Sequence, residues 1–157
     1  MAINVGQSAP DFTLYDTTKK QVKLSDFKGE NVLLLFFRLA FSSVCTAELC
    51  SVRDHMKMYE ELDVKPIGIS VDSLYSLAKF KEDQNLNFPL LSDFNKEVSK
   101  EYGSLYDKFG YGMEGVSKRS AFIIDKEGIV QYAEVLENAG EQPNFEAIRT
   151  KLMELNH

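Results

Sequence analysis

The two cysteines of this 157-residue chain, Cys45 and Cys50, lie in one short segment that offers its best candidate for chemistry. Cys45 follows an apolar run and falls in the first turn of a predicted helix. Unpaired backbone N–H groups and the positive end of the helix dipole favour a thiolate there, and the thiolate is the nucleophilic form of cysteine. Ser42 can offer a hydroxyl to an incoming oxygen or to the sulfur, and Glu48, one turn downstream, can hold a cation in place. Position alone leaves open that Cys45 is an inert buried residue, because free cysteines are often buried.

The spacing of these residues argues against two other kinds of site. A thioredoxin-type reductase needs two residues between its cysteines, whereas four separate Cys45 from Cys50. Cys45, Cys50 and His55 recur every five residues, so each is turned by ~140° from the last and the three share no helix face for zinc. The glycine-rich stretch 110–115 lacks the strand–helix context of a phosphate loop, and we interpret it as a flexible connection. No metal, nucleotide, haem or flavin is implied.

The segments around Cys45 alternate between strand-like and helix-like patterns. Alternating apolar residues on both sides of 16–20 predict an opening β-hairpin, and the continuous apolar run 31–37 predicts a central strand covered on both faces. Helical spacing runs from 43 to 62 and places Cys45 on the apolar face. The other expected elements are a buried strand at 65–71, a helix at 73–84 capped by Ser73, a short strand at 88–92, a helix at 95–102, a hairpin of 120–125 and 129–135, and a closing helix along Phe145, Ile148, Leu152 and Leu155.

This order of elements predicts one α/β domain over residues 1–157, a thioredoxin-like sandwich with an N-terminal β-hairpin extension. The net charge of −6, with no basic cluster, argues against nucleic acid or an anionic membrane as a partner. No apolar run approaches the ~20 residues of a membrane span, and the first twelve residues lack the features of a secretory signal. We therefore expect a cytoplasmic protein.

The segment from Phe37 to Cys50 resembles the active-site signature of the peroxiredoxins, Pro-x-x-x-Thr/Ser-x-x-Cys. Ser42 and Cys45 fill its last two defined positions, and Glu48 matches the acidic residue that commonly follows. Further landmarks resemble the family along nearly the whole chain: Gly6-x-x-Ala-Pro-Asp-Phe12, Leu24-Ser-Asp-Phe-Lys-Gly29, Ile67-Gly-Ile-Ser-Val-Asp72 and Arg119-Ser-Ala-Phe-Ile-Ile-Asp125. The resemblance implies the peroxiredoxin fold and a thiol-dependent peroxidase.

The resemblance also implies roles for single residues. The Cys45 thiolate would attack the terminal oxygen of hydrogen peroxide or an organic hydroperoxide, which gives a sulfenic acid and water or an alcohol. Arg119 would stabilise the thiolate and the polarising O–O bond, and Ser42 would hydrogen-bond the substrate. Without the resemblance, Arg119 would be interpreted as a surface residue at a strand edge, and Glu48 as an ordinary first-turn acid.

One residue departs from the signature, because Arg38 stands where the family has proline. An arginine there frees φ, adds a backbone donor and brings a cation near the pocket. We interpret Arg38 as a modulator of the substrate pocket. Two outcomes stay open: a guanidinium directed at the pocket, or one that points outward and leaves a looser, slower site.

The spacing of Cys50 from Cys45 resembles the peroxiredoxin Q (bacterioferritin comigratory protein) group, in which the second cysteine resolves the sulfenic acid as an intramolecular disulfide. Residues five apart on a helix lie about 8–9 Å apart at Cα, whereas a disulfide needs roughly 7 Å or less, so residues 43–53 must unfold locally. The helical wheel turns Cys50 away from the apolar stripe, which favours access over burial. Features that resemble the alkyl hydroperoxide reductase E type keep a one-Cys mechanism open.

The family implies thioredoxin or a similar thiol as the reductant, and a monomer or a homodimer. A rival of another class also stays open. In that case the chain is a weakly active redox sensor or holdase in which Arg38 has slowed turnover.

Overall fold

A mixed β-sheet forms the centre of the protein. The computed structural model describes residues 3–138 and 140–155, and within them the sheet has seven strands in the order β2-β1-β5-β4-β3-β6-β7. β3 (Asn31–Phe36) runs parallel to β4 (Val64–Ser70) and antiparallel to β6 (Ser120–Ile124). Ser120 pairs with Phe36, so β6 begins beside the point where β3 ends.

Two hairpins extend the sheet on its two sides, as the sequence predicts. β1 (Thr13–Asp16) and β2 (Gln21–Lys23) form the N-terminal hairpin, and β1 joins the central strands through β5 (Leu90–Ser92). β6 pairs with β7 (Val130–Val135), and Gly128 in the intervening turn has a φ of +84°, which a residue without Cβ adopts freely. The predicted α/β sandwich with an N-terminal hairpin extension is confirmed.

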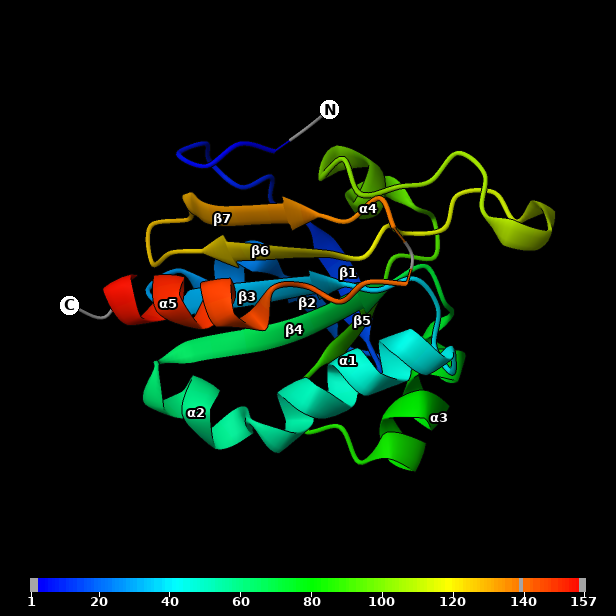
Figure 1. Ribbon diagram of the computed structural model, residues 1–157, viewed down its shortest axis with the longest axis horizontal. Helices are drawn as coiled ribbons and strands as arrows, with labels where there is room; N and C mark the ends of the chain where they lie inside the picture. Colours follow the sequence, from blue (N-terminus) through cyan, green and yellow to red (C-terminus); the bar gives the residue numbers. More distant parts are fainter. Residues whose placement is uncertain (1–2, 139, 156–157) are drawn as a thin grey trace.

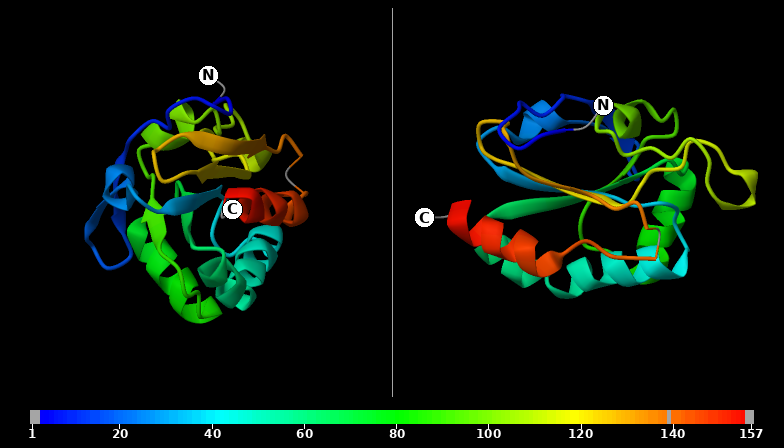
Figure 2. Two further views of the ribbon diagram at one scale, coloured as in Figure 1. Left: turned by 90° about the vertical axis from the view of Figure 1, so that its left-hand side faces the viewer. Right: turned by 45° about the horizontal axis from the view of Figure 1, so that its top comes forward.

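The helices and the N-terminal segment cover the two faces of this sheet (Figures 1 and 2). α1 (Ser43–Asp54), α2 (Met56–Glu61), α3 (Leu74–Gln84) and α5 (Phe145–Leu155) lie on one face. The N-terminal segment, the 3-10 helix η1 (Leu24–Phe27) and α4 (Glu97–Glu101) lie on the other. β3 is buried along its whole length, and alternate residues enter the two apolar clusters, so that Leu33 and Leu35 pack on the α1 face. This is why its sequence is a continuous apolar run rather than an alternating one.

The prediction of a single helix over 43–62 is wrong, because the helix is interrupted at His55. α1 ends at Asp54 and α2 begins at Met56, because His55 leaves helical geometry with φ −107° and ψ 16°. Its backbone N–H donates to the carbonyls of Ser51 and Val52, and its ring Nδ1 lies 2.7 Å from the Ser51 oxygen. Neither glycine nor proline marks the break, so the periodic apolar pattern runs through it. The predicted cap is confirmed at α3, where the Ser73 hydroxyl accepts from the Ser76 N–H at 3.2 Å.

Residues 104–118 project from the sheet as a two-stranded ribbon (Figures 1 and 2). Bridges between Leu105 and Ser117 and between Lys108 and Glu114 hold its two sides together, and the 3-10 turn η2 (Gly110–Gly112) lies at its tip. The glycine-rich stretch 110–115 is therefore part of an ordered ribbon rather than only a flexible connection. The ribbon leaves the molecule at the end of the sheet where β3 ends and α1 begins.

Candidate active site

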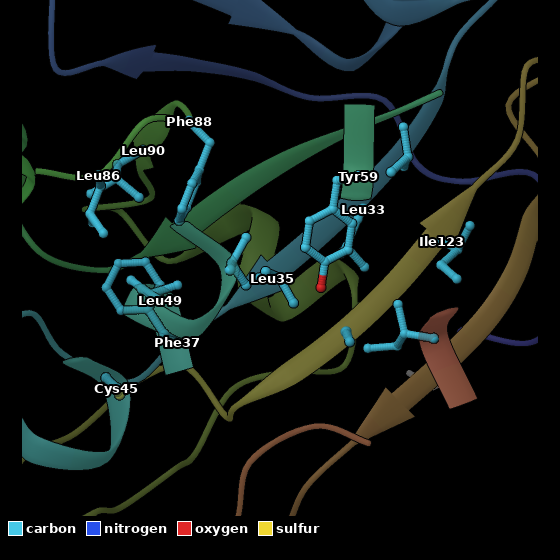
Figure 3. Packing of buried hydrophobic residues seen from close by; sticks show 14 of the residues in the cluster. Leu33, Leu35, Phe37, Cys45, Leu49, Tyr59, Leu86, Phe88, Leu90 and Ile123 are labelled. Carbon is cyan, nitrogen blue, oxygen red and sulfur yellow. The ribbon is translucent and has the colours of Figure 1, made fainter. Parts of the chain in front are cut away.

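Cys45 lies in the first turn of α1, as predicted, and its side chain is completely buried. The chain reaches α1 from the end of β3 through a loop over residues 37–42. In that loop the Ala40 N–H donates to the Asp72 carboxylate at 2.8 Å, which ties the loop to the end of the neighbouring strand β4. Cys45 packs beside Phe37 and Leu49 at one end of the apolar cluster (Figure 3). Its sulfur therefore lies at a helix N-terminus that is shielded from water.

Arg119 is also completely buried and faces the sulfur. Its Nη1 donates to Cys45 Sγ at 3.1 Å and to Glu48 Oε1 at 2.9 Å. The residue directly precedes β6, and because β6 begins beside the end of β3, the guanidinium lies against the first turns of α1. The surface position considered for Arg119 from the sequence alone is wrong. A cation at this distance stabilises negative charge on the sulfur.

Glu48 completes a buried group of three side chains with Cys45 and Arg119. Burial raises the pKa of Glu48 to about 7, although the charge of Arg119 and, more weakly, that of Arg38 oppose the rise. Its second carboxylate oxygen, Oε2, is buried without a hydrogen-bond partner. The carboxyl that shares Nη1 of Arg119 with the sulfur thus changes its charge near neutral pH.

Ser42 is the N-cap residue of α1, but its side chain does not cap the helix. Its hydroxyl donates to the Leu39 carbonyl at 2.8 Å, while its own carbonyl accepts from the N–H and the hydroxyl of Thr46. The expected hydrogen bond from Ser42 to a substrate would require the hydroxyl to leave Leu39, and it stays a prediction.

Arg38 extends from the 37–42 loop toward the projecting ribbon. Its guanidinium carbon lies 5.1 Å from the centroid of the Phe109 ring, a cation–π contact between the loop and the ribbon. The side chain is half-buried, and its Nε is buried without a hydrogen-bond partner. Because its charge lowers the pKa of Glu48, Arg38 lies within electrostatic reach of the buried group. The guanidinium therefore packs against the projecting ribbon, and the role of Arg38 as a modulator of the substrate pocket stays a prediction.

The helical wheel predicts an accessible Cys50, but the side chain is half-buried and packs against the apolar cluster. Its Sγ–H donates to Gln84 Oε1 at 3.4 Å, at the end of α3. Arg53 donates to the Gln84 carbonyl, and Asn87 Nδ2 donates to the Arg53 carbonyl at 3.3 Å. These four residues, called the Gln84 cluster below, fasten the second half of α1 to the end of α3. In the structure neither cysteine forms a disulfide.

Three residues at or near the site, namely Asp72, Gln84 and Phe109, were not assigned a role from the sequence. Asp72 carries a usable signal, because it follows a buried strand parallel to the one that leads to Cys45. Gln84 and Phe109 carry no such sequence signal, since their roles depend on contacts between segments far apart in the chain. Within the described ranges, no group of three or more His, Cys, Asp and Glu side chains is placed to hold a metal ion.

Comparison with known proteins decides the family. The model of the AhpC/TSA family matches residues 5–133, which is most of the chain. The chain is a peroxiredoxin. It is 38% identical to alkyl hydroperoxide reductase E of Mycobacterium tuberculosis over 136 residues, which cover 85% of this chain and 86% of that protein. It is also 38% identical to the chloroplastic 2-cysteine peroxiredoxin of Chattonella marina over 161 residues, covering 96% and 80% of the two chains.

The likeness extends to the solved structures of the peroxiredoxins. The crystal structure of peroxidoxin BcpB from Mycobacterium tuberculosis matches with a TM-score of 0.87 at 28% sequence identity, over 98% of both chains. The thioredoxin-like peroxiredoxin fold expected from the sequence is thereby confirmed, and so is the enzyme class, a thiol peroxidase that acts on peroxides. No helix in the described part of this peroxiredoxin is long and apolar enough to cross a membrane.

Proposed function

We propose that this peroxiredoxin reduces hydrogen peroxide and organic hydroperoxides with Cys45 as the attacking residue. One observation carries the proposal: Nη1 of the buried Arg119 donates to both Cys45 Sγ and Glu48 Oε1. A guanidinium held in place by a carboxylate stabilises a thiolate before the reaction and the charge that develops on the oxygens during it. Because water is excluded, both interactions are stronger than they would be on a surface.

In the first step the Cys45 thiolate attacks the terminal oxygen of the peroxide R–O–O–H. The S–O bond forms as the O–O bond breaks, the sulfur is oxidised by two electrons to the sulfenic acid, and the leaving RO⁻ takes a proton to become an alcohol, or water when R is hydrogen. Arg119 Nη1 and the Ser42 hydroxyl are the donors we expect to contact the two oxygens. The positive end of α1 adds to this stabilisation.

In the second step we propose that Cys50 resolves the sulfenic acid. The Cys50 sulfur displaces hydroxide from the Cys45 sulfur, which gives an intramolecular disulfide and water. A thioredoxin-like dithiol then returns two electrons and two protons and becomes a disulfide itself. Cys45 and Cys50 belong to one intact helix, so residues 43–53 must unfold first, and the hydrogen bonds of the Gln84 cluster must open.

Intact-mass measurement of the reduced protein after one equivalent of peroxide tests both steps. The full chain should lose two hydrogens as the disulfide forms, Cys50→Ser should gain one oxygen, and Cys45→Ser should keep its mass. A gain of one oxygen by the full chain would reject the resolving role of Cys50 and establish the one-Cys mechanism. Peroxide consumption with thioredoxin or dithiothreitol should vanish in Cys45→Ser; equal rates in the two proteins would reject the enzyme mechanism in favour of the sensor or holdase.

The reductant and the oligomeric state that accompany this proposal come from the family, and the location and the single domain come from the sequence. They are a thioredoxin-like reductant, a cytoplasmic location and a monomer or homodimer built from one domain over residues 1–157. All of them stay predictions.

A further inference from the structure

Arg38 carries a positive charge that forms no ion pair with an acidic side chain of the described chain. No carboxylate among the described residues lies within ion-pair distance of its guanidinium, although the side chain is half-buried. Its Nε lies inside the protein without a hydrogen-bond partner. A partly desolvated cation without a partner anion is costly, and an anionic ligand that pairs with it recovers that cost.

The Phe109 ring holds this cation in one place. The guanidinium lies over the ring at 5.1 Å, so the face of the guanidinium is occupied by the aromatic contact. The two Nη groups at its edge make no hydrogen bond to the described residues, and their fork matches the two oxygens of a carboxylate. The ring itself offers an apolar surface to whatever lies beside the charge.

The place of Arg38 in the fold relates it to the reacting sulfur. The residue belongs to the short loop that joins β3 to α1, seven positions before Cys45, and the ribbon that carries Phe109 leaves the molecule at the same end of the sheet (Figures 1 and 2). Cys45 and Arg119 are completely buried, so the organic part of a bound hydroperoxide must extend from the sulfur toward the surface, and Arg38 lies at the end of the sheet where α1 and its Cys45 begin. The charge of Arg38 lowers the pKa of Glu48, which agrees with a short separation between Arg38 and the buried group of Cys45, Glu48 and Arg119.

We propose that Arg38 determines specificity, by selecting hydroperoxides whose organic part carries a carboxylate. The carboxylate binds the edge of the Arg38 guanidinium, and the apolar part of the substrate lies beside Phe109, while the peroxide group reaches Cys45. This inference rests on the proposed peroxidase function of Cys45. The overall charge of −6 repels anions, so a local cation at the site is what an anionic substrate requires.

A matched pair of substrates tests the proposal. They are cumene hydroperoxide with a carboxylate at the para position of its ring and the methyl ester of the same compound, which differ in charge and not in the reacting group. The quantity compared is the ratio of kcat/KM for the acid to kcat/KM for the ester, measured within each protein, so that a general loss of activity in a variant cancels.

The wild-type ratio should be about tenfold, the value expected for one charge-assisted hydrogen bond at a half-exposed site. In Arg38→Met the ratio should fall to near one, and in Arg38→Lys it should lie between these values because the charge remains without the planar fork. Lys108→Met is the matched control, because it removes an exposed cation from the same ribbon and should keep the wild-type ratio. High salt should lower the wild-type ratio, since screening weakens a partly exposed ion pair.

Two results would overturn the inference. The first is an acid-to-ester ratio in Arg38→Met equal to that of the wild type. The second is a fall of this ratio in Lys108→Met as large as that in Arg38→Met, which would show a general effect of positive charge. Hydrogen peroxide serves as the third substrate and separates this failure from that of the proposed function. Turnover of hydrogen peroxide with no preference for the acid rejects only the role of Arg38. No turnover of hydrogen peroxide rejects the peroxidase function, and the inference with it.

Discussion

Replacing Glu48 with glutamine should remove a pH-dependent loss of stability from the folded protein. Two effects compete at this carboxyl: burial favours its neutral form, whereas Arg119 at 2.9 Å favours its charged form. Burial is the larger effect, and it raises the pKa of Glu48 from 4.5 to about 7. The folded state therefore holds a proton on Glu48 between these pH values that the unfolded state has lost. Because of this difference the free energy of unfolding falls as pH rises through that window.

The size of the effect follows from the two pKa values. The rise of the pKa from 4.5 to about 7, at about 1.36 kcal/mol for each pH unit, corresponds to roughly 3 kcal/mol of stability that is present below pH 4.5 and absent above pH 7. Glutamine keeps an oxygen for Arg119 and has no proton to lose. The stability of Glu48→Gln relative to wild type should thus increase by up to this amount between pH 4.5 and pH 8.

Urea denaturation of the reduced proteins across this pH range measures the difference directly. Ionisable groups remote from Glu48 titrate equally in both proteins and cancel. Glu60→Gln, which removes an exposed carboxyl from α2, should show no such trend. A difference between Glu48→Gln and wild type that stays constant with pH, or that grows toward low pH, would refute the reasoning. It would mean that the ion pair with Arg119 outweighs burial and keeps Glu48 charged.

Two further predictions concern the opening of α1 and the packing of the sheet. Arg53→Ala removes the hydrogen bond to the Gln84 carbonyl, so α1 should unfold more readily. The rate of disulfide closure after a peroxide pulse, measured by quenched-flow mass spectrometry, should then increase several-fold. Lys79→Ala makes an equal change of charge on α3 and should leave this rate unchanged. Gly68→Ala should lower the free energy of unfolding in urea by about 1–3 kcal/mol, because a Cβ there would lie 2.6 Å from a Leu90 methyl carbon; an unchanged midpoint would show that Leu90 moves aside without cost.

The alternation of strands and helices was readable from the sequence because each element leaves a local pattern. The apolar run of β3, the hairpin around Gly128 and the Ser73 cap all depend on residues a few positions apart, and all three were predicted correctly. The break at His55 was not, because its backbone geometry leaves no apolar or glycine signal. Cys50 was expected to be accessible because a helical wheel shows only the faces of one helix. It cannot show that the end of α3 packs beside the face that carries Cys50.

The sequence by itself determined that Cys45 begins a helix after a buried strand, where a thiolate is favoured, and its landmarks pointed to the peroxiredoxins. Only the tertiary structure decided what surrounds that sulfur. Arg119 lies 74 residues away in the chain and reaches Cys45 because β6 pairs antiparallel with β3. In the same way, Phe109 comes to Arg38 through the projecting ribbon. Local patterns report which elements form, whereas the charges and contacts at a buried site depend on which elements pack together.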